Sequence, residues 1–359
     1  MGHSSILIID QAAECTIWRQ GRHYRACHGK LVRSMFAFIH RHHAVDTILG
    51  EMAVSLLFSV IKDIASHIAS AGAKPTGTQS QGKAEESVVR SMEAGDWGRA
   101  DQLCAELIRS FPDEKKFVEL QLAVHNAIAH QRLPGPNYMD WLPWFHALLK
   151  PATYVEIGVE SGRSLQFAMP PTRAIGVDPG MEVVHSQEAW VKLFKLTSDD
   201  FFARYSLPSV LQTDIVDLAF IDGLHTFDQA LKDFINIERF SAPNSVVLFH
   251  DVLPVVPVTA NRERTTMLWV GDTWKAILML LQRRPELKIF TIPTYPSGLA
   301  VVTNLDSDSN VLSRDFERIC QDAMGHNLDD YLPTLERHLN ILATNDFETV
   351  ERVLDAHRK

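Results

Sequence analysis

The pattern of apolar and polar residues changes at about residue 151. Over 85–132, apolar residues recur at helical spacing, and Gly95 and Pro112 divide the stretch into about three helices. After Pro151, short apolar runs rich in β-branched residues alternate with helical segments. Continuous apolar runs separated by helices predict a parallel sheet that is covered on both faces. The expected strands are 153–159, 173–179, 192–197, 216–222, 245–252, 288–293 and 298–305.

The last two runs are joined by "TYPS", which is too short for a crossover helix, so we expect these two strands to pair antiparallel. The predicted fold class is therefore α/β, with a Rossmann-like sheet that is mostly parallel and has an antiparallel final strand. A helical N-terminal region precedes the sheet.

The same pattern divides the chain into five parts. A helical region of unknown role covers 1–70, and a segment rich in Gly, Ser, Thr, Gln and Pro predicts a flexible linker at 71–87. A helical cap with one tetratricopeptide-like hairpin is expected at 88–137. Since one hairpin cannot bury both of its faces and no second copy follows, packing on the next domain is favoured over a peptide-binding array. The α/β domain is expected at 138–305, and a C-terminal helical extension at 306–359.

Composition and charge narrow the function classes. The formal net charge is −9, and the basic residues form no dominant run, which argues against nucleic-acid binding. The four cysteines lie far apart without a CxxC pair, which is typical of reduced thiols in a cytosolic protein. The apolar stretch 51–72 is interrupted by Lys62 and Asp63, and no signal peptide is evident. We therefore expect a cytoplasmic protein without a membrane span.

The segment "TYVEIGVESGRSLQFAMPPTRAIGVDPG" at 153–180 has the form of a ligand-binding turn. The first strand is expected to end near Gly158, and a helix to begin near Ser161–Ser164, with free N–H groups at its N-terminus. Glu160 stands where a dinucleotide fingerprint has its middle glycine, and its carboxylate would repel a pyrophosphate. Asp178, at the end of the second strand, can accept hydrogen bonds from ribose hydroxyls. The pattern favours a nucleoside cofactor without phosphates over a structural turn.

Four polar residues follow two of the later strands. "VDLAFIDGLH" supplies Asp222 and His225, and "SVVLFHDV" supplies His250 and Asp251. Neighbouring parallel strands end at the same edge of a sheet, so we expect these side chains beside Gly158. Asp and His can hold a divalent ion that polarises a substrate hydroxyl, and an imidazole is a suitable general base. The structural alternative is that Asp222 caps the next helix and His250 is a satisfied core residue.

The segment "YVEIGVESGRSL…AIGVDP" resembles the first and second motifs of class I S-adenosylmethionine (SAM)-dependent methyltransferases. The resemblance implies SAM as the cofactor. The residues assigned to its binding are Glu156, Gly158 and Gly162 at the methionine end, Ser164 at the start of the expected helix, Asp178 at the ribose, and Ser198 and Asp199 at the adenine.

The spacing around "DGLH" and "FHD" is similar to metal-dependent O-methyltransferases of the macrocin and mycinamicin type, and to cephalosporin hydroxylase-like relatives. By this resemblance, which covers 138–305, the metal ligands are Asp222, His250 and Asp251, and His225 is the base. Relatives usually have an acidic residue where this chain has His250. That departure tilts the expected metal from Mg²⁺ toward Mn²⁺ or another transition ion.

The predicted function is SAM-dependent O-methylation of a hydroxyl on a small molecule or glycoside, assisted by Mg²⁺ or Mn²⁺, with Asp222 and His225 at the catalytic centre. Two alternatives stay open: a metal-dependent hydroxylase or oxygenase on the same scaffold, and a non-catalytic helical adaptor. A homo-oligomer is a further open alternative. The loop 254–267 should lie over the active-site edge, where Trp269, Asp272, Trp274 and Lys275 either line a substrate pocket or, as for Trp274, pack the next helix on the sheet.

Overall fold

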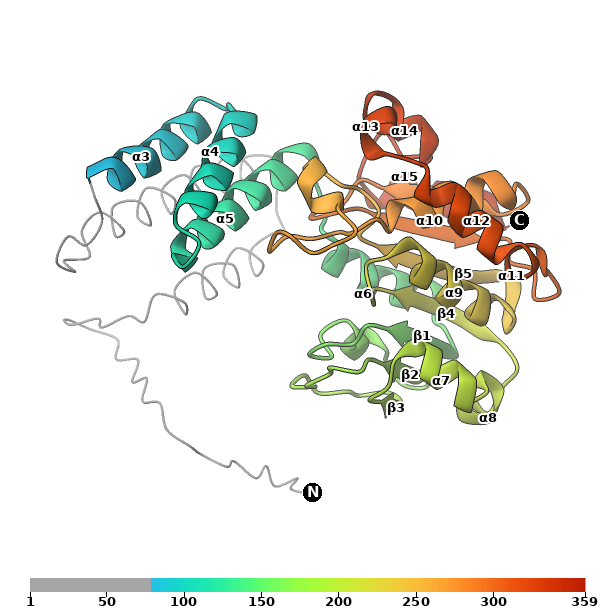
Figure 1. The fold of residues 1–359 in the computed structure, drawn as a ribbon. Coiled ribbons are helices and arrows are strands. Elements are labelled where there is room, and N and C mark those ends of the chain that lie inside the picture. Colours follow the sequence, from blue (N-terminus) through green and yellow to red (C-terminus); the bar gives the residue numbers. More distant parts are fainter. Residues whose placement is uncertain (1–78, 359) are drawn as a thin grey trace, which may run out of the picture. The chain divides into compact units, whose positions relative to one another are not determined.

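The structure is a computed structural model that describes residues 79–358 (Figure 1). The predicted N-terminal helical region at 1–70 and the first part of the predicted linker, 71–78, lie outside the described residues.

The described residues 79–132 form three helices, as the pattern at 85–132 predicts: α3 (Gln79–Glu93), α4 (Trp97–Ser110) and α5 (Lys115–Arg132). The expectation of a flexible linker up to residue 87 is wrong for 79–87, because α3 begins at Gln79. Val88 and Met92 of this helix are fully buried, and α3 packs along α4. The burial of Val88 and Met92 therefore stabilises α3, although the N-terminal half of this helix has the composition of a linker.

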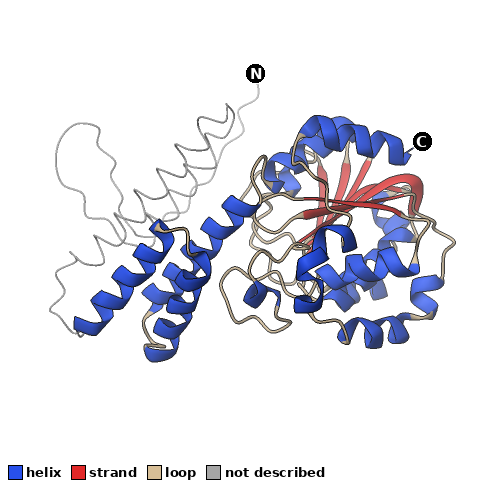
Figure 2. Cartoon of the chain, turned by 90° about the horizontal axis from the view of Figure 1, so that it is seen from above, coloured by secondary structure: helices blue, strands red, loops and turns tan. Residues whose placement is uncertain are grey.

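Seven strands form one sheet in the order β3-β2-β1-β4-β5-β7-β6. Strand β7 runs antiparallel to β5 and β6, and the other neighbours pair parallel. Helices cover both faces (Figure 2). The predicted α/β class, with a mostly parallel sheet and an antiparallel final strand, is confirmed. The bounds are β1 Thr153–Ile157, β2 Arg173–Val177, β3 Trp190–Phe194, β4 Val216–Ile221, β5 Ser241–His250, β6 Lys288–Ile292 and β7 Leu299–Thr303.

The connection between β1 and β2 departs from the prediction. The α-helix expected from Ser161–Ser164 is wrong, since only the short 3₁₀ helix η1 (Leu165–Phe167) forms there. Pro170 and Pro171 follow almost at once, and proline cannot continue a helix. The β1–β2 connection therefore offers no α-helical N-terminus to a ligand.

The β3–β4, β4–β5 and β5–β6 connections carry helices, whereas the β2–β3 and β6–β7 connections contain none. The helix that enters the sheet is α6 (Tyr138–Leu149), whose capping box between Asn137 and Asp140 fixes its first turn. The elements that follow it are α7 (Ser198–Arg204), α8 (Leu207–Leu211), α9 (Phe227–Glu238), η2 (Pro257–Ala260) and α10 (Trp274–Arg283). The part of the chain that the structure describes contains no helix long and apolar enough to cross a membrane.

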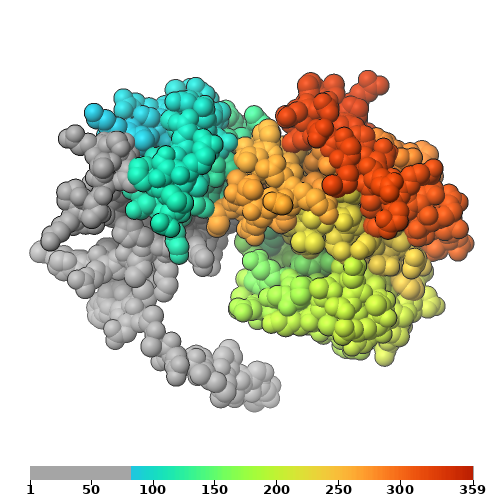
Figure 3. Space-filling model, viewed as in Figure 1, coloured from blue at the N-terminus to red at the C-terminus, as the bar shows by residue number. Residues whose placement is uncertain are grey.

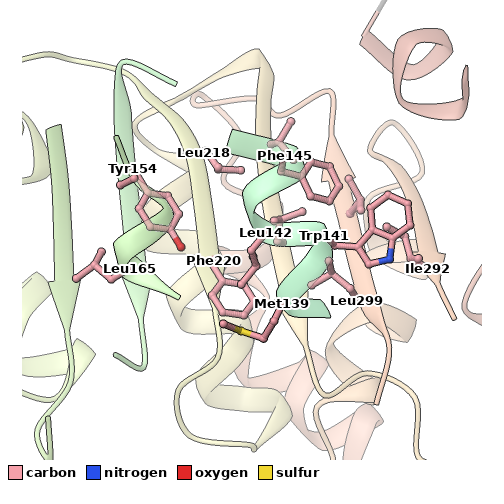
Figure 4. Close-up of a cluster of buried hydrophobic side chains, with 14 of the residues drawn as sticks. Met139, Trp141, Leu142, Phe145, Tyr154, Leu165, Leu218, Phe220, Ile292 and Leu299 are labelled. Atoms are coloured by element: carbon pink, nitrogen blue, oxygen red, sulfur yellow. The ribbon is translucent and has the colours of Figure 1, made fainter. Parts of the chain in front are cut away.

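A core of apolar side chains fixes α6 on the sheet. Trp141, Leu142 and Phe145 of α6 are buried against β4 and β7, where they meet Phe220 and Leu299 (Figure 4). Burying large apolar side chains of this kind stabilises a domain by roughly 1.5–3 kcal/mol each. This core therefore holds the first residues of α6 near the ends of β4 and β5.

The C-terminal extension is helical but interrupted. Its elements are α11 (Val311–Arg314), α12 (Phe316–Met324), α13 (Leu328–Tyr331), η3 (Leu332–Thr334), α14 (Leu335–His338) and α15 (Phe347–Arg358). Between α14 and α15, Ile341 forms a β-bridge to Thr291 of β6. The segment covers an edge strand that would otherwise present unpaired backbone groups. Val350 and Leu354 of α15 join the core cluster around α6.

Candidate active site

The loop after β1 lies directly against the end of β4. Gly158 has a φ of +90°, and a Cβ placed on it would lie 1.9 Å from the backbone oxygen of Asp222. Gly162 has a φ of +76°, and its Cβ would lie 2.8 Å from a methyl group of Val183. Both positions need glycine, because an L-residue there would be strained and would also collide. The turn thereby brings the predicted cofactor segment beside Asp222.

Glu156 supports this loop from inside the sheet. Its side chain is fully buried, and its two oxygens accept hydrogen bonds from the hydroxyls of Tyr154 (2.6 Å) and Ser164 (2.7 Å). Burial raises the pKa of Glu156 to about 8, although both hydrogen bonds oppose the rise. Glu156 and Ser164, both predicted cofactor residues, are thus hydrogen-bonded to each other.

Asp178 cross-links the ends of β1 and β2. One of its oxygens accepts from the backbone N–H groups of Val159 (3.0 Å) and Glu160 (2.8 Å), and the other from Gly180 (2.6 Å). The carboxylate that was predicted to hold the ribose therefore fixes the conformation of the loop around Glu160, whose φ is +47°.

Ser198 and Asp199 begin α7 and bond to α9. The side-chain amide of Gln229 donates to Ser198 Oγ (3.0 Å) and to Asp199 Oδ1 (3.0 Å). The Lys232 ammonium lies 3.3 Å from Asp199 Oδ2. These contacts join α7 to α9, the helix that follows His225.

The structure brings together the four polar residues that follow β4 and β5, which we call the second constellation: Asp222, His225, His250 and Asp251. His225 Nε2 lies 3.1 Å from Asp251 Oδ2 and 3.7 Å from Asp222 Oδ1. His250 Nδ1 lies 3.1 Å from Asp222 Oδ1 and 3.4 Å from Asp251 Oδ2. Asp251 has a φ of +56°, a strained conformation for a non-glycine residue. Backbone strain of this kind gathers at functional sites, where the surrounding structure maintains it.

The positive charge of His250 offsets part of the negative charge of Asp222 and Asp251 in this cluster. Burial lowers the pKa of His250, but the carboxylates of Asp251 and Asp222 outweigh burial and raise it to about 10. Burial would raise the pKa of Asp251, yet the charges of His250 and His225 hold it well below its usual range. The cluster therefore contains a cationic imidazole between two carboxylates.

The same cluster fits a divalent metal ion. Asp222, His250 and Asp251 each offer one ligand atom, and these atoms lie within 4.8 Å of one another. Two carboxylate oxygens and one imidazole nitrogen suit Mn²⁺ or another transition ion better than Mg²⁺, which prefers oxygen ligands. A metal on His250 Nδ1 would replace the proton that this nitrogen now shares with the carboxylates.

The imidazole of His225 is held by the backbone of a loop. Its Nδ1 lies 2.8 Å from the carbonyl oxygen of Trp269, and the two rings stack with centroids 5.1 Å apart. A carbonyl oxygen only accepts, so Nδ1 carries a hydrogen and Nε2 is the nitrogen that can take up a proton. The loop that supplies Trp269 runs from 251 to 273, and its middle part, residues 261–265, is exposed (orange in Figure 3).

Two roles were predicted for Trp274: lining a substrate pocket, or packing the next helix on the sheet. Packing is right, because the side chain of Trp274, the first residue of α10, is 1% exposed. Asp272 is also buried, and its Oδ1 accepts from the backbone N–H of Phe227 at 3.0 Å. Asp272 therefore anchors the loop to the first residue of α9.

Sequence reasoning missed two side chains of the site. Ser297, in the turn between β6 and β7, donates a short hydrogen bond to Asp251 and lies 3.4 Å from His250 Nε2. Tyr138, the first residue of α6, stacks on His250 with centroids 4.1 Å apart. "TYPS" was treated only as a connection between two strands, and Tyr138 was given no role. The sequence signal for Ser297 and Tyr138 was limited to their hydroxyl groups, in segments that the topology brings to the edge of the sheet where β4 and β5 end.

Comparison with protein families gives a match to part of the chain. Residues 155–252, from β1 to the residue after Asp251, match the family described as "Methyltransferase domain". This match supports a methyltransferase activity, and the predicted site residues from Glu156 to Asp251 all lie within the matched segment.

Several solved structures are similar to this chain. One is an O-methyltransferase from Klebsiella pneumoniae, with 14% identity, a TM-score of 0.36, and coverage of 57% of this chain and 97% of that chain. Another is the O-methyltransferase of Streptomyces achromogenes involved in tomaymycin synthesis, in complex with SAM, with 17% identity, a TM-score of 0.35 and coverage of 52% and 89%. A third is an O-methyltransferase from Bacillus cereus, with 15% identity, a TM-score of 0.34 and coverage of 58% and 99%. No curated protein matches the chain.

Proposed function

We propose that this methyltransferase transfers the methyl group of SAM to a hydroxyl of a small molecule or glycoside, with His225 as general base and Asp222, His250 and Asp251 as ligands of a divalent metal. The observation that carries the proposal is the meeting of two acidic residues and two histidines at the ends of β4 and β5. The glycine loop at Gly158 touches the backbone of the same strand end.

The proposed roles follow from the geometry. His225 Nε2 removes the proton of the acceptor hydroxyl, and the imidazolium that results is stabilised by Asp251 at 3.1 Å. The Trp269 carbonyl keeps the ring oriented through Nδ1. The acceptor oxygen then bonds to the methyl carbon as the carbon–sulfur bond breaks, which leaves S-adenosylhomocysteine (SAH). A bound divalent metal would lower the pKa of the acceptor hydroxyl.

We assign the binding site of the cofactor to the loop that follows β1 and to the end of β2. Gly158 and Gly162 allow close approach of the chain, and Glu156 with Ser164 stiffens the loop. Asp178 is the proposed ribose ligand, and it would have to exchange one of its backbone hydrogen bonds for a ribose hydroxyl. Ser198 and Asp199 are the proposed adenine contacts, and their bonds to Gln229 would compete with that role.

Calorimetry with SAH tests the cofactor, with and without added Mn²⁺ or Mg²⁺. Transfer of label from [methyl-³H]SAM to a panel of phenolic and sugar acceptors then tests the reaction, before and after treatment with a chelator. We expect SAH to bind, and transfer to fall on chelation and return with Mn²⁺. Failure of SAH to bind under every metal condition would refute the proposal. Oxygen uptake with ferrous iron, without methyl transfer, would favour the hydroxylase alternative.

A further inference from the structure

The turn between β6 and β7 lies against the proposed metal ligands. Ser297, in this turn, is fully buried, and its hydroxyl donates its one hydrogen to Asp251. The same oxygen is 3.4 Å from His250 Nε2 and can accept from the N–H of that ring. One hydroxyl therefore orients two of the three proposed ligands from the side away from the cluster.

The backbone of the turn is locked to the chain that follows Asp251. The N–H of Leu253 donates to the carbonyl of Ser297 at 2.6 Å. Gly298 has a φ of +77°, and a Cβ there would lie 2.4 Å from Leu253 Cγ. Ser297 and Asp251 are thus fixed relative to each other by main-chain contacts as well as by the hydroxyl.

The other side of the turn is held by α5 of the helical cap. The hydroxyl of Tyr295 donates to Asn126 Oδ1 at 2.5 Å, and its ring stacks on His130 with centroids 3.7 Å apart and planes 10° apart. The carbonyl of Tyr295 accepts from the N–H of Tyr138 at 3.2 Å, and the Tyr138 ring stacks on His250. Tyr295 therefore links the cap both to the turn that carries Ser297 and to the residue that covers His250.

We propose that Ser297 is a positioning residue of the metal site and that α5 of the helical cap holds it in place through Tyr295. The inference rests on the metal ligands assigned under Proposed function. Hydrogen bonds to metal ligands fix their orientation, and removing such a partner typically weakens metal binding about 10–100-fold. This gives the helical cap a role that does not require a repeat array, because α5 supports the proposed metal site through Tyr295.

Mn²⁺ binding to the full chain, followed by calorimetry and by the electron paramagnetic resonance signal of free Mn²⁺, tests the proposal without an acceptor. We expect Ser297→Ala to weaken Mn²⁺ binding about 10–100-fold. The matched control is Ser307→Ala, at an exposed position beyond β7, which should bind Mn²⁺ like the wild type. SAH affinity should stay within about twofold in both variants, because the contacts of Ser297 are with Asp251 and His250 and not with the β1–β2 loop.

The role of the cap is tested by Tyr295→Phe, which keeps the ring on His130 and removes only the hydroxyl that bonds to Asn126. We expect a loss of Mn²⁺ affinity in the same direction and smaller, up to about 10-fold, with Tyr205→Phe at the exposed end of α7 as control.

The outcomes separate the two proposals. Unchanged Mn²⁺ affinity in Ser297→Ala overturns the positioning role, and unchanged affinity in Tyr295→Phe overturns the role of the cap. A wild type that binds no Mn²⁺ overturns both, whereas SAH binding reports on the methyltransferase separately.

Discussion

The backbone of Gly158 rests on the backbone of Asp222. A Cβ at Gly158 would lie 1.9 Å from the Asp222 oxygen, and the N–H of Asp222 donates to the carbonyl of Ile157 at 2.8 Å. The glycine thereby joins the proposed cofactor loop to the proposed catalytic strand end with no side chain between them. Close approach of the methyl donor and the acceptor hydroxyl depends on this contact, since methyl transfer requires the two to be aligned.

Gly158→Ala should disrupt both stability and cofactor binding. An L-residue at this φ costs about 1–2 kcal/mol, and overpacking adds about 1–3 kcal/mol, so we expect the free energy of unfolding to fall by about 2–5 kcal/mol. SAH affinity should fall with it, because the loop must move away from β4. Urea unfolding and calorimetry measure the two effects. Gly98→Ala is the matched control, since a Cβ at Gly98 in α4 meets nothing within 4 Å. It should leave SAH binding unchanged, and wild-type values for Gly158→Ala would contradict the inferred contact.

His225→Ala should abolish most of the methyl transfer and leave ligand binding intact. Loss of a general base typically costs about 10²–10⁴-fold in rate, and we expect this fall in kcat. SAH affinity should stay within a few-fold, because His225 contacts the Trp269 carbonyl and the carboxylates and not the β1–β2 loop. Labelled transfer to an acceptor found in the panel gives kcat. The exposed His338 of α14 provides the control, His338→Ala, whose kcat should match the wild type. A wild-type kcat for His225→Ala would mean that another group removes the proton.

The sheet and the second constellation could be predicted from the sequence because both depend on local pattern. Apolar runs gave the strands, and parallel neighbours end at the same edge. Asp222 and Asp251 therefore had to meet once β4 and β5 were adjacent. The linker prediction failed at α3 because Val88 and Met92 supply tertiary packing that composition does not reveal. The α-helix after β1 failed because the glycines and Pro170–Pro171 leave room only for a 3₁₀ turn.

The missed parts of the site share a different cause. Ser297 reaches Asp251 from a turn 46 residues further along the chain. His225 is held by the main-chain oxygen of Trp269, which any residue type would supply. A backbone carbonyl leaves no mark in the sequence, and a serine in a turn is usually a turn former. Only the antiparallel insertion of β7 next to β5, seen in the structure, shows that this turn ends beside the proposed metal ligands.

The pH dependence of stability should report on Glu156. Burial raises its pKa to about 8 from the 4.5 of an exposed glutamate, so the native state keeps a proton that the unfolded chain releases above about pH 4.5. This contribution to stability is fully present below pH 4.5 and is lost as the pH rises through 8. We therefore expect the free energy of unfolding to decline between pH 5 and pH 8 in the wild type.

Glu156→Gln should flatten this decline, because a neutral amide has no proton to lose and can still accept from Ser164. Urea unfolding at several pH values between 5 and 8 measures the difference. Glu188→Gln, at an exposed position before β3, is the control and should follow the wild-type curve. Parallel curves for the wild type and Glu156→Gln would show that Glu156 is ionised in the folded protein across this range.

Two ion pairs of Arg262 hold the loop over His225. The guanidinium of Arg262 lies 2.8 Å from Asp228 of α9 and 3.2 Å from Asp272. The N–H of Asp272 donates to the carbonyl of His225 at 3.2 Å. Gly271 approaches the same carbonyl so closely that a Cβ there would lie 1.7 Å from it. Trp269 therefore contacts the ring of His225, and Asp272 binds its backbone carbonyl. Arg262 connects this segment to α9 through Asp228.

Arg262→Ala should lower kcat by about 10–100-fold, because a small displacement of a positioned catalytic group has costs of this size. The KM for SAM should stay within about twofold, since the change is remote from the β1–β2 loop. Arg264→Ala is the matched control: it removes an arginine from the same loop whose guanidinium donates to the Met267 carbonyl and lies 5.9 Å from the Trp269 ring. Its kcat should remain near the wild-type value. Equal losses in both variants would assign the effect to the loop's charge, whereas a loss confined to Arg262→Ala would assign it to the ion pairs with Asp228 and Asp272.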